Sequence, residues 1–134
     1  MSVFMIRNHR PSHVSLGDRG EIQGWNYLGQ RGYRILHLNY RCFLGELDVV
    51  AMRGKRLAFV EIKTRRQDRY GTPEEAVHSE KQKRLIRLAA YYLKAEGWED
   101  VPVSFDVLAI RWFENQEPEF RLIQDAFGLE ETRT

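Results

Sequence analysis

The sequence predicts an α/β domain in which helices flank a central mixed sheet. Three observations indicate this class: a helical period over residues 17–31, three strand-like segments between residues 33 and 64, and a second helical period over residues 79–96 that more strand-like sequence follows. Helical and strand periods that alternate along a chain are typical of α/β domains. The expected order of elements is α-β-β-β-α-β.

The first helix is predicted from residue 17 to residue 31. Ile22, Trp25 and Leu28 recur at helical spacing, which gives this segment one apolar face. Gly32 stands where a glycine commonly ends a helix. The preceding residues 1–16 show no period of either kind, so we expect a flexible arm there.

Three strands are predicted over residues 33–41, 46–52 and 57–64, the last two joined by the short turn 53–56 as an antiparallel hairpin. Alternate residues of a strand share a face, so charged side chains are expected to interrupt one face of each hairpin strand. In the strand 46–52, one face is expected to carry Glu46, Asp48 and Val50, and the other face Leu47, Val49 and Ala51. In the strand 57–64 and just beyond it, one face is expected to carry Phe59, Glu61, Lys63 and Arg65, and the other face Ala58, Val60, Ile62 and Thr64.

The second half of the chain begins with a basic loop over residues 65–73 that is long enough to lie over a site. A helix is predicted over residues 79–96, where Ser79 and Gln82 form a capping-box pattern and Gly97 ends the helix. Its apolar stripe consists of Leu85, Leu88, Ala89 and Tyr92, and strands are predicted at 103–112 and 119–124.

A length of 134 residues fits one domain, which we expect over residues 17–127, between the arm at 1–16 and a polar tail at 128–134. The single Cys42 cannot form an intramolecular disulfide, and no Cys/His cluster has zinc-ligand spacing. No apolar run is long enough to span a bilayer. The expected location is therefore the cytoplasm.

Charge is distributed unevenly along the chain. Residues 53–94 carry 12 basic and 5 acidic side chains, whereas residues 95–134 carry 3 basic and 10 acidic ones. The basic middle is a candidate polyanion-binding region, and the alternative interpretation is a solvated helix face plus a basic loop. No glycine-rich phosphate loop is present, which argues against nucleotide-dependent chemistry.

The hairpin brings together the residue types of a metal-dependent hydrolase. If its strands pair in register, Glu46 or Asp48 lies close to Glu61 and Lys63. Two carboxylates about 4 Å apart repel by about 4 kcal/mol near a protein surface, and a cation, an amine or a raised carboxyl pKa relieves this. Oxygen ligands favour Mg²⁺ or Mn²⁺ over zinc, which suits phosphodiester hydrolysis. The alternative is a Glu61–Lys63 ion pair on a half-exposed hairpin.

Asp48, a turn, and then Glu61-Ile62-Lys63 resemble the (P)D…(D/E)xK active-site pattern of the restriction-endonuclease-like nuclease superfamily. A closer resemblance, over about residues 17–112, is to the bacterial family UPF0102, the YraN-like proteins, whose GELD…FVEIKTR core is specific. The matching residues are Gly20-Glu21, Gly32-Tyr33, Asn39-Tyr40-Arg41, Gly45-Glu46-Leu47-Asp48, Phe59-Val60-Glu61-Ile62-Lys63-Thr64-Arg65, Gly71, Lys81 and Phe105-Asp106-Val107.

That family is similar in turn to archaeal Holliday-junction resolvases, in which a helix glutamate, an aspartate and an E-x-K motif bind divalent metal. The resemblance implies a restriction-endonuclease-like α-β-β-β-α-β core with a central mixed sheet, and Mg²⁺ or Mn²⁺ as the cofactor. By motif position it implies catalytic roles for Glu21, Asp48, Glu61 and Lys63. The candidate metal ligands are Asp48, Glu61 and Glu21, to which the strand spacing adds Glu46.

Basic residues near this motif are candidates for binding nucleic acid. Guanidinium groups suit phosphates bidentately, and lysines neutralise a nucleic-acid backbone without reading sequence. For the loop residues the alternative is a solubilising surface, and Tyr70 can either stack on a base or cover the core. The candidates are Arg65, Arg66 and Arg69 after the E-x-K, and Lys81, Lys83, Arg84 and Arg87 early in the second helix.

Other polar and aromatic residues are expected to serve the fold. Asp106 lies within an apolar strand and should accept a hydrogen bond from a backbone amide or an arginine. The core is expected to contain Trp25, Tyr91, Tyr92 and Trp112.

The preferred hypothesis is a metal-dependent, nuclease-like protein that acts on structured or branched DNA by phosphodiester hydrolysis. Its expected partner is nucleic acid, with DNA favoured and no membrane involved, and a homodimer would match the paired arms of a branched substrate. The alternatives are a non-catalytic nucleic-acid-binding module of the same fold, and a protein-interaction subunit that uses the acidic C-terminal segment.

Overall fold

The structure, a computed structural model, describes residues 16–66 and 78–128. The predicted arm up to residue 15, Arg69 and Tyr70 of the predicted loop, and the tail beyond Gly128 lie outside the described residues. The elements are α1 (Leu16–Gln30), β1 (Tyr33–Cys42), β2 (Gly45–Arg53), β3 (Arg56–Arg66), α2 (Ser79–Glu96), β4 (Val103–Phe113) and β5 (Gln116–Phe127).

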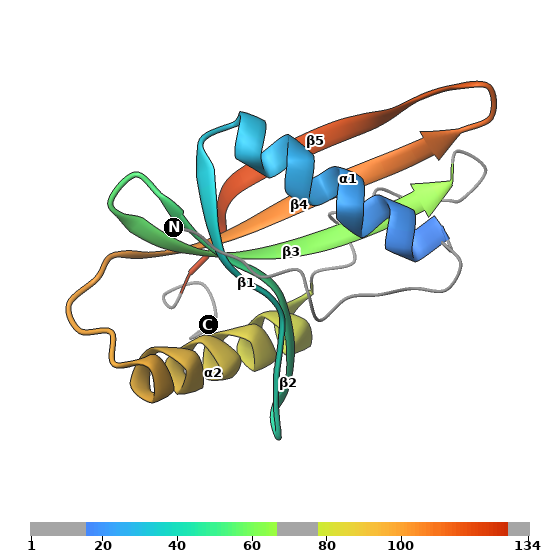
Figure 1. Cartoon of the computed structure of the whole chain (residues 1–134). Helices are drawn as coiled ribbons and strands as arrows, with labels where there is room; N and C mark the ends of the chain where they lie inside the picture. The colour runs from blue at the N-terminus through green and yellow to red at the C-terminus, as the bar shows by residue number, and fades with distance from the viewer. Residues whose placement is uncertain (1–15, 67–77, 129–134) are drawn as a thin grey trace.

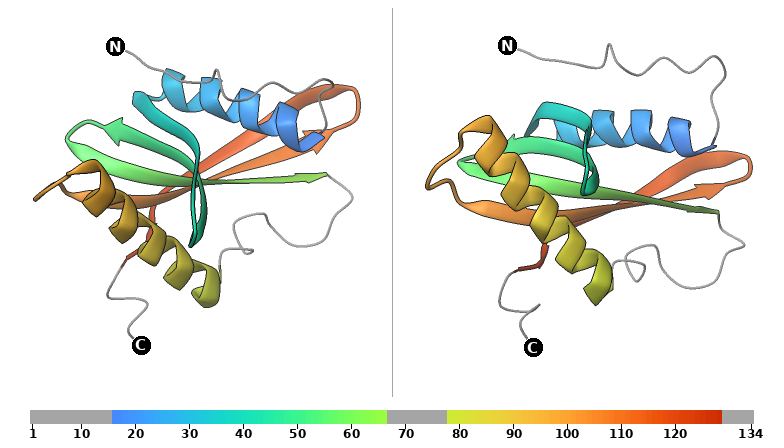
Figure 2. Two further views of the ribbon diagram at one scale, coloured as in Figure 1. Left: turned by 60° about the horizontal axis from the view of Figure 1, so that its bottom comes forward. Right: turned by 90° about the horizontal axis from the view of Figure 1, so that it is seen from below.

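The five strands form one mixed sheet in the order β1-β2-β3-β4-β5. β3 and β4 pair in parallel across α2, and the other three pairs are antiparallel. α1 lies against one face of the sheet and α2 against the other (Figures 1 and 2). The predicted α/β class, with two helices and a mixed sheet, is confirmed.

Each face of the sheet has its own hydrophobic core. Beneath α1, Trp25 and Leu28 pack on side chains that include Val49, Val60 and Leu108. Beneath α2, the predicted stripe of Leu85, Leu88, Ala89 and Tyr92 packs on Leu47, Val50, Leu57, Phe59, Phe105, Val107 and Phe127. β3 and β4 are covered on both faces and therefore form the buried centre of the described structure.

Glycines let α1 approach the sheet closely. A Cβ added at Gly20 would collide with the Cγ2 methyl of Thr64 on β3. A Cβ at Gly24 would lie 3.2 Å from side-chain carbons of both Ile62 and Leu108. These glycines lower the helical propensity of α1, but they allow the helix to pack closely on the sheet.

The predicted bounds of α2 are confirmed, and Gly97 ends the helix in the left-handed conformation with φ 78°. The predicted capping box is wrong, because the N-cap residue is His78 and no side chain caps it. Ser79 is consequently inside the helix, one position too late to cap it. Neither described helix is long and apolar enough to cross a membrane.

The β1–β2 hairpin bends at Asn39, which has a left-handed φ of 54°. The flanking pairs Leu38↔Val49 and Tyr40↔Leu47 place Asn39 opposite Asp48. Beyond this point the hairpin curls toward α2 (Figure 1), and Leu47 packs in the same core as Val50. The predicted grouping of Leu47 with Val49 and Ala51 is therefore wrong, since strict alternation fails at the bend.

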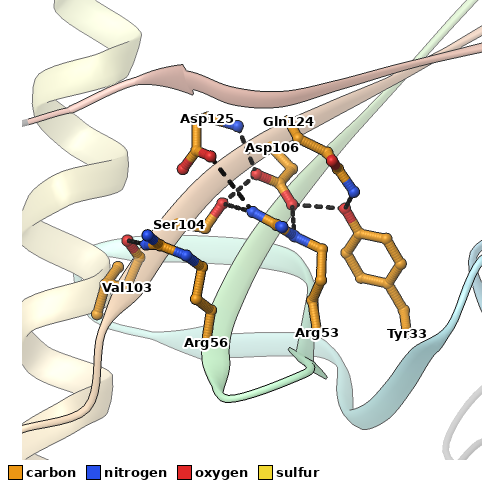
Figure 3. Close-up of polar contacts among 8 residues, drawn as sticks. All are labelled: Tyr33, Arg53, Arg56, Val103, Ser104, Asp106, Gln124 and Asp125. Atoms are coloured by element: carbon orange, nitrogen blue, oxygen red, sulfur yellow. Dashed lines mark hydrogen bonds and ion pairs between the residues drawn. The ribbon is translucent and has the colours of Figure 1, made fainter.

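A network of polar side chains around Asp106 joins β1, β2, β4 and β5 (Figure 3). The buried Asp106 carboxylate accepts hydrogen bonds from the Tyr33 hydroxyl at 2.6 Å, the Arg53 guanidinium at 3.3 Å, the Asp125 backbone amide at 2.9 Å and the Ser104 hydroxyl. The prediction that Asp106 accepts from a backbone amide or an arginine is confirmed on both counts. β5, which carries Asp125, is longer than the predicted 119–124.

Candidate active site

The candidate site lies where β2 leaves β3. The two strands pair from Arg53↔Arg56 as far as Val49↔Val60, and a continued ladder would place Leu47 opposite Ile62. Instead the backbone N–H of Ile62 donates to Asp48 Oδ2 at 2.8 Å. A side-chain carboxylate thus takes the role that a strand carbonyl would otherwise have, and this fixes Asp48 beside the second half of β3.

Glu61 is buried next to this contact and is paired with two lysines. Lys63 Nζ, from the same strand, lies 3.3 Å from Glu61 Oε2, and Lys81 Nζ, from α2, lies 2.6 Å from the same oxygen. Only 8% of the Glu61 side chain is exposed, so both ammonium groups act where solvent screens little. The half-exposed ion pair of the alternative interpretation does not describe this buried, three-membered cluster.

The pKa of Asp48 is strongly affected by its surroundings, which include the nearby Glu61. Burial and the charge of Glu61 raise the pKa of Asp48 to about 8, against the hydrogen bond from Ile62. The charges of Glu21 and Glu46 raise the pKa of Asp48 further. Two of the expected remedies for carboxylate repulsion are therefore present, namely a raised pKa at Asp48 and neighbouring amines at Glu61.

The two lysines also differ in their electrostatics. Burial lowers the pKa of Lys63, and the neighbouring amine of Lys81 lowers it further, against the attraction of Glu61. Burial also acts to lower the pKa of Lys81, but the hydrogen bond and charge of Glu61, together with Lys63 and Asp48, raise it above the ordinary value. The pKa values of the two lysines therefore shift in opposite directions, although both ammonium groups contact Glu61.

The remaining predicted metal ligands are less closely joined to this cluster. Glu46 is exposed and forms an ion pair with Arg41 at 3.5 Å. Glu21 is half-buried on α1 and is close enough for its charge to act on Asp48. Within residues 16–66 and 78–128, no three His, Cys, Asp or Glu side chains are grouped so that they could hold a metal ion.

The predicted nucleic-acid-binding residues that the structure describes lie on β3 and on α2. Arg65 and Arg66 belong to β3 rather than to a loop, and Arg65 donates to the backbone oxygen of Thr64 at 3.1 Å. Lys83, Arg84 and Arg87 are exposed on α2, whereas Lys81 contacts Glu61 inside the site.

The sequence does not predict the contact of Lys81 with Glu61, although it does indicate the face of α2 on which Lys81 lies. Lys81 precedes Leu85 by four positions, which places it on the buried stripe of α2 rather than on the outer face. A lysine at the start of an apolar stripe, on a helix that packs over a strand with a buried glutamate, is well placed for an ion pair.

The donor chemistry of the site suits a hard cation. Mg²⁺ is commonly held through one or two carboxylates, while water and substrate phosphate supply the other ligands. Asp48 and Glu61 provide such a pair, since both offer only oxygen atoms and the charge of Glu61 acts on Asp48 in addition to burial. A cation between them would add to the compensation that both lysines give to Glu61 and that Lys81 also gives to Asp48.

A family profile and individual relatives indicate the same family for this chain. Residues 20–110 match the sequence profile described as "Uncharacterised protein family UPF0102". A "UPF0102 protein" of Moorella thermoacetica is 46% identical over 75% of this chain and 83% of its own length. Proteins with the same description from Syntrophus aciditrophicus and Geotalea uraniireducens are 41% and 40% identical, over 87% and 93% of this chain and 91% and 98% of their own lengths.

Proposed function

The chain belongs to the UPF0102 family, and we propose that it is a metal-dependent, nuclease-like protein that hydrolyses phosphodiester bonds in structured or branched DNA. The observation that carries this proposal is the junction of Asp48, Glu61 and Lys63 at the point where β2 and β3 separate. In the proposed function this junction is the active site of a restriction-endonuclease-like core.

The proposed cofactor is Mg²⁺ or Mn²⁺, held by Asp48 and Glu61, with Glu21 and Glu46 adding negative charge nearby. When bound, such an ion would polarise a phosphoryl oxygen and acidify a water molecule. Asp48 would have to release its proton to take part, because only the carboxylate is a good ligand.

The chain's own residues would carry the rest of the reaction. Hydrolysis joins a water oxygen to phosphorus and breaks a phosphorus–oxygen bond, so negative charge builds on the phosphate before the leaving oxygen takes a proton. Lys63 is placed to orient the water or to offset this charge. Lys81 would keep the Glu61 carboxylate in position, which leaves Lys63 free to turn toward the substrate.

Nucleic acid is the proposed partner because basic residues continue from the site along α2. Lys83, Arg84 and Arg87 are exposed there, and Arg66 is exposed at the end of β3. Cations in such a row neutralise successive phosphates, which gives an affinity that falls with salt and does not depend on sequence. A homodimer would let two such rows meet the paired arms of a branched substrate.

One observation favours a second candidate, a nucleic-acid-binding module without turnover. Glu61 is already neutralised by Lys63 and Lys81, at 3.3 Å and 2.6 Å, so the fold does not require a cation. A protein of this kind would bind DNA with the same salt dependence and leave every substrate intact.

A cleavage assay over duplex, single-stranded, flapped and four-way-junction DNA tests the proposal. We expect cuts in branched substrates with Mg²⁺ or Mn²⁺, no cuts with EDTA, and loss of cleavage in Asp48→Ala. Glu117→Gln alters an exposed side chain on β5 and is the matched control, so this variant should cleave DNA normally. Salt-dependent DNA binding by the wild type without cleavage under any of these conditions would contradict the nuclease and favour the binding module.

A further inference from the structure

A pair of exposed aromatic side chains stands apart from both hydrophobic cores. Phe43, in the two-residue tip of the β1–β2 hairpin, is 81% exposed, and Tyr91, on α2, is 38% exposed. Their rings meet edge to face with centroids 5.4 Å apart. Tyr91 was expected in the core, but it lies one position before the buried Tyr92 and therefore points away from the sheet.

The hairpin tip is held against α2, so the position of Phe43 is fixed. Gly45 follows the tip, and a Cβ added there would lie 3.4 Å from Leu88 and 3.9 Å from Arg84. Leu44, beside Phe43, packs against the core beneath α2. Leu44 is directed toward the core, whereas the neighbouring Phe43 is directed outward and leaves most of its apolar surface in water.

The surroundings of the pair are cationic. Arg84, Arg87 and Tyr91 follow one another at helical spacing, and both arginines are exposed. Arg41, on β1 close to the tip, is also exposed, although Glu46 pairs with it. An aromatic platform among arginines has the chemistry of a single-stranded nucleic-acid site, where bases stack on rings and cations follow the phosphates.

We propose that Phe43 and Tyr91 form a stacking site for an unpaired base, and that Arg84 and Arg87 hold the adjoining phosphates. The inference rests on the proposed function and refines its substrate class to DNA with an unpaired or unstacked base, as at a gap, a flap or a branch point. A fully paired duplex presents no free base face to the platform.

The helix also relates this platform to the candidate site. Lys81 contacts Glu61 from the first turn of α2, and Tyr91 lies ten positions later on the same rigid helix. Ten residues rise by about 15 Å, which corresponds to about four base-pair steps at about 3.4 Å each. The stacked base should therefore lie a few nucleotides from a phosphate in the site.

The test is equilibrium binding without divalent metal, so that cleavage does not enter the result. Wild-type protein, Phe43→Leu and Phe43→Tyr are compared on a duplex with a short single-stranded gap and on the same duplex fully paired. A fluorescent adenine analogue in the gap reports stacking. Phe43→Tyr is the matched control because it keeps the exposed ring.

We expect Phe43→Leu to weaken binding to gapped DNA by at least about fivefold and to lose the fluorescence change, because one stacked base contributes at least that factor. Fully paired DNA should bind all three proteins within about twofold, and Phe43→Tyr should behave as wild type. Equal affinity of Phe43→Leu and wild type for gapped DNA, or an equal loss on both DNAs, would overturn the stacking site.

An exposed aromatic pair could instead bind a second copy of the chain. Light scattering on the free proteins tests this, because it measures their oligomeric state. A wild-type dimer that Phe43→Leu dissociates, with DNA affinity unchanged, would overturn the stacking site in favour of self-association. Cleavage by the wild type distinguishes the two proposals. Cleavage by the wild type together with equal binding of wild type and Phe43→Leu to gapped DNA overturns only the stacking site, and stacking without cleavage contradicts only the nuclease.

Discussion

The Lys81 ammonium on α2 lies 2.6 Å from the Glu61 carboxylate, closer than the 3.3 Å of Lys63, which follows Glu61 by two positions in the same strand. The tighter of the two ion pairs in the candidate site is therefore the one between different elements. It fastens the start of α2 to β3, and it leaves Lys63 as the more weakly held cation.

Replacing Lys81 by methionine should lower the free energy of unfolding by about 2 kcal/mol, because a buried carboxylate loses one of two charged partners. Urea unfolding at pH 7 measures this. Lys83→Met, two positions along the same helix and exposed, is the matched control and should change stability by less than about 0.5 kcal/mol. Equal losses in both variants would mean that the Lys81 ion pair contributes nothing to stability.

Stability should fall as pH rises from about 4 to about 8, because Asp48 is protonated in the folded protein over this range and ionised in the unfolded chain. The raised pKa of Asp48, about 8, means that the folded state binds more protons, so each pH unit costs at most about 1.4 kcal/mol. Asp48→Asn should flatten this part of the urea-unfolding profile. Glu117→Gln should leave the slope unchanged, and a wild-type profile that rises from pH 5 to pH 8 would contradict the protonated Asp48.

Lys63→Ala should abolish cleavage while DNA affinity stays within a few-fold, because the lost interaction matters where charge develops in the transition state. Lys83→Ala and Arg87→Ala should each weaken binding to all sequences and lower the slope of log affinity against log salt by about one unit. Paired cleavage and anisotropy titrations separate these effects. A Lys63→Ala protein that cuts normally would remove this residue from the proposed reaction.

Asp106→Asn should destabilise the fold by about 3 kcal/mol, because it leaves the guanidinium of Arg53 without its buried counter-ion. Asp125→Asn is the control, since that side chain is 59% exposed and contacts the same arginine at 3.5 Å. Its loss should stay below about 0.5 kcal/mol in urea unfolding. Similar losses in the two variants would show that Asp106 is no more important than a surface carboxylate.

Gly20→Ala should destabilise the protein, because the added Cβ meets the Cγ2 methyl of Thr64. Thr64→Ser removes that methyl, so the double variant should recover most of the loss, a coupling that a double-mutant cycle of melting temperatures measures. Gly29→Ala, on the same helix with open space around it, should instead stabilise by about 0.5 to 1 kcal/mol. A Gly20→Ala loss that persists unchanged when combined with Thr64→Ser would place its cause elsewhere.

The sequence predicts the elements well wherever one local signal dominates. The stripe of Leu85, Leu88, Ala89 and Tyr92 with Gly97 behind it predicts α2 from residue 79 to residue 96, as found. The turn containing Gly54, with φ 64°, likewise predicts the β2–β3 hairpin. Both signals act within a few residues and need no knowledge of distant packing.

Features that depend on bends or on contacts between elements are not predicted in this way. Asn39 tolerates a left-handed φ, but nothing adjacent to it shows that the hairpin turns there and moves Leu47 to the other core. The predicted proximity of Asp48 to Glu61 follows from strand pairing, whereas the hydrogen bond to Ile62 exists because that pairing stops. The partner of Lys81 becomes known only when α2 is placed over β3.

We expect the span of each contact along the chain to influence how early that contact forms during folding. The Asp48–Ile62 bond joins residues 14 positions apart, whereas the Tyr33–Asp106 bond joins residues 73 apart. Short loops close at a lower entropic cost, and hairpins form within about 10 μs. The hairpin alone is therefore sufficient to bring the two carboxylates together, and we expect it to close at a lower entropic cost than the contacts that span the whole sheet. If the carboxylates already meet in the folding transition state, proton uptake at Asp48 relieves their repulsion there, so we expect mildly acidic solution to speed the folding of this chain.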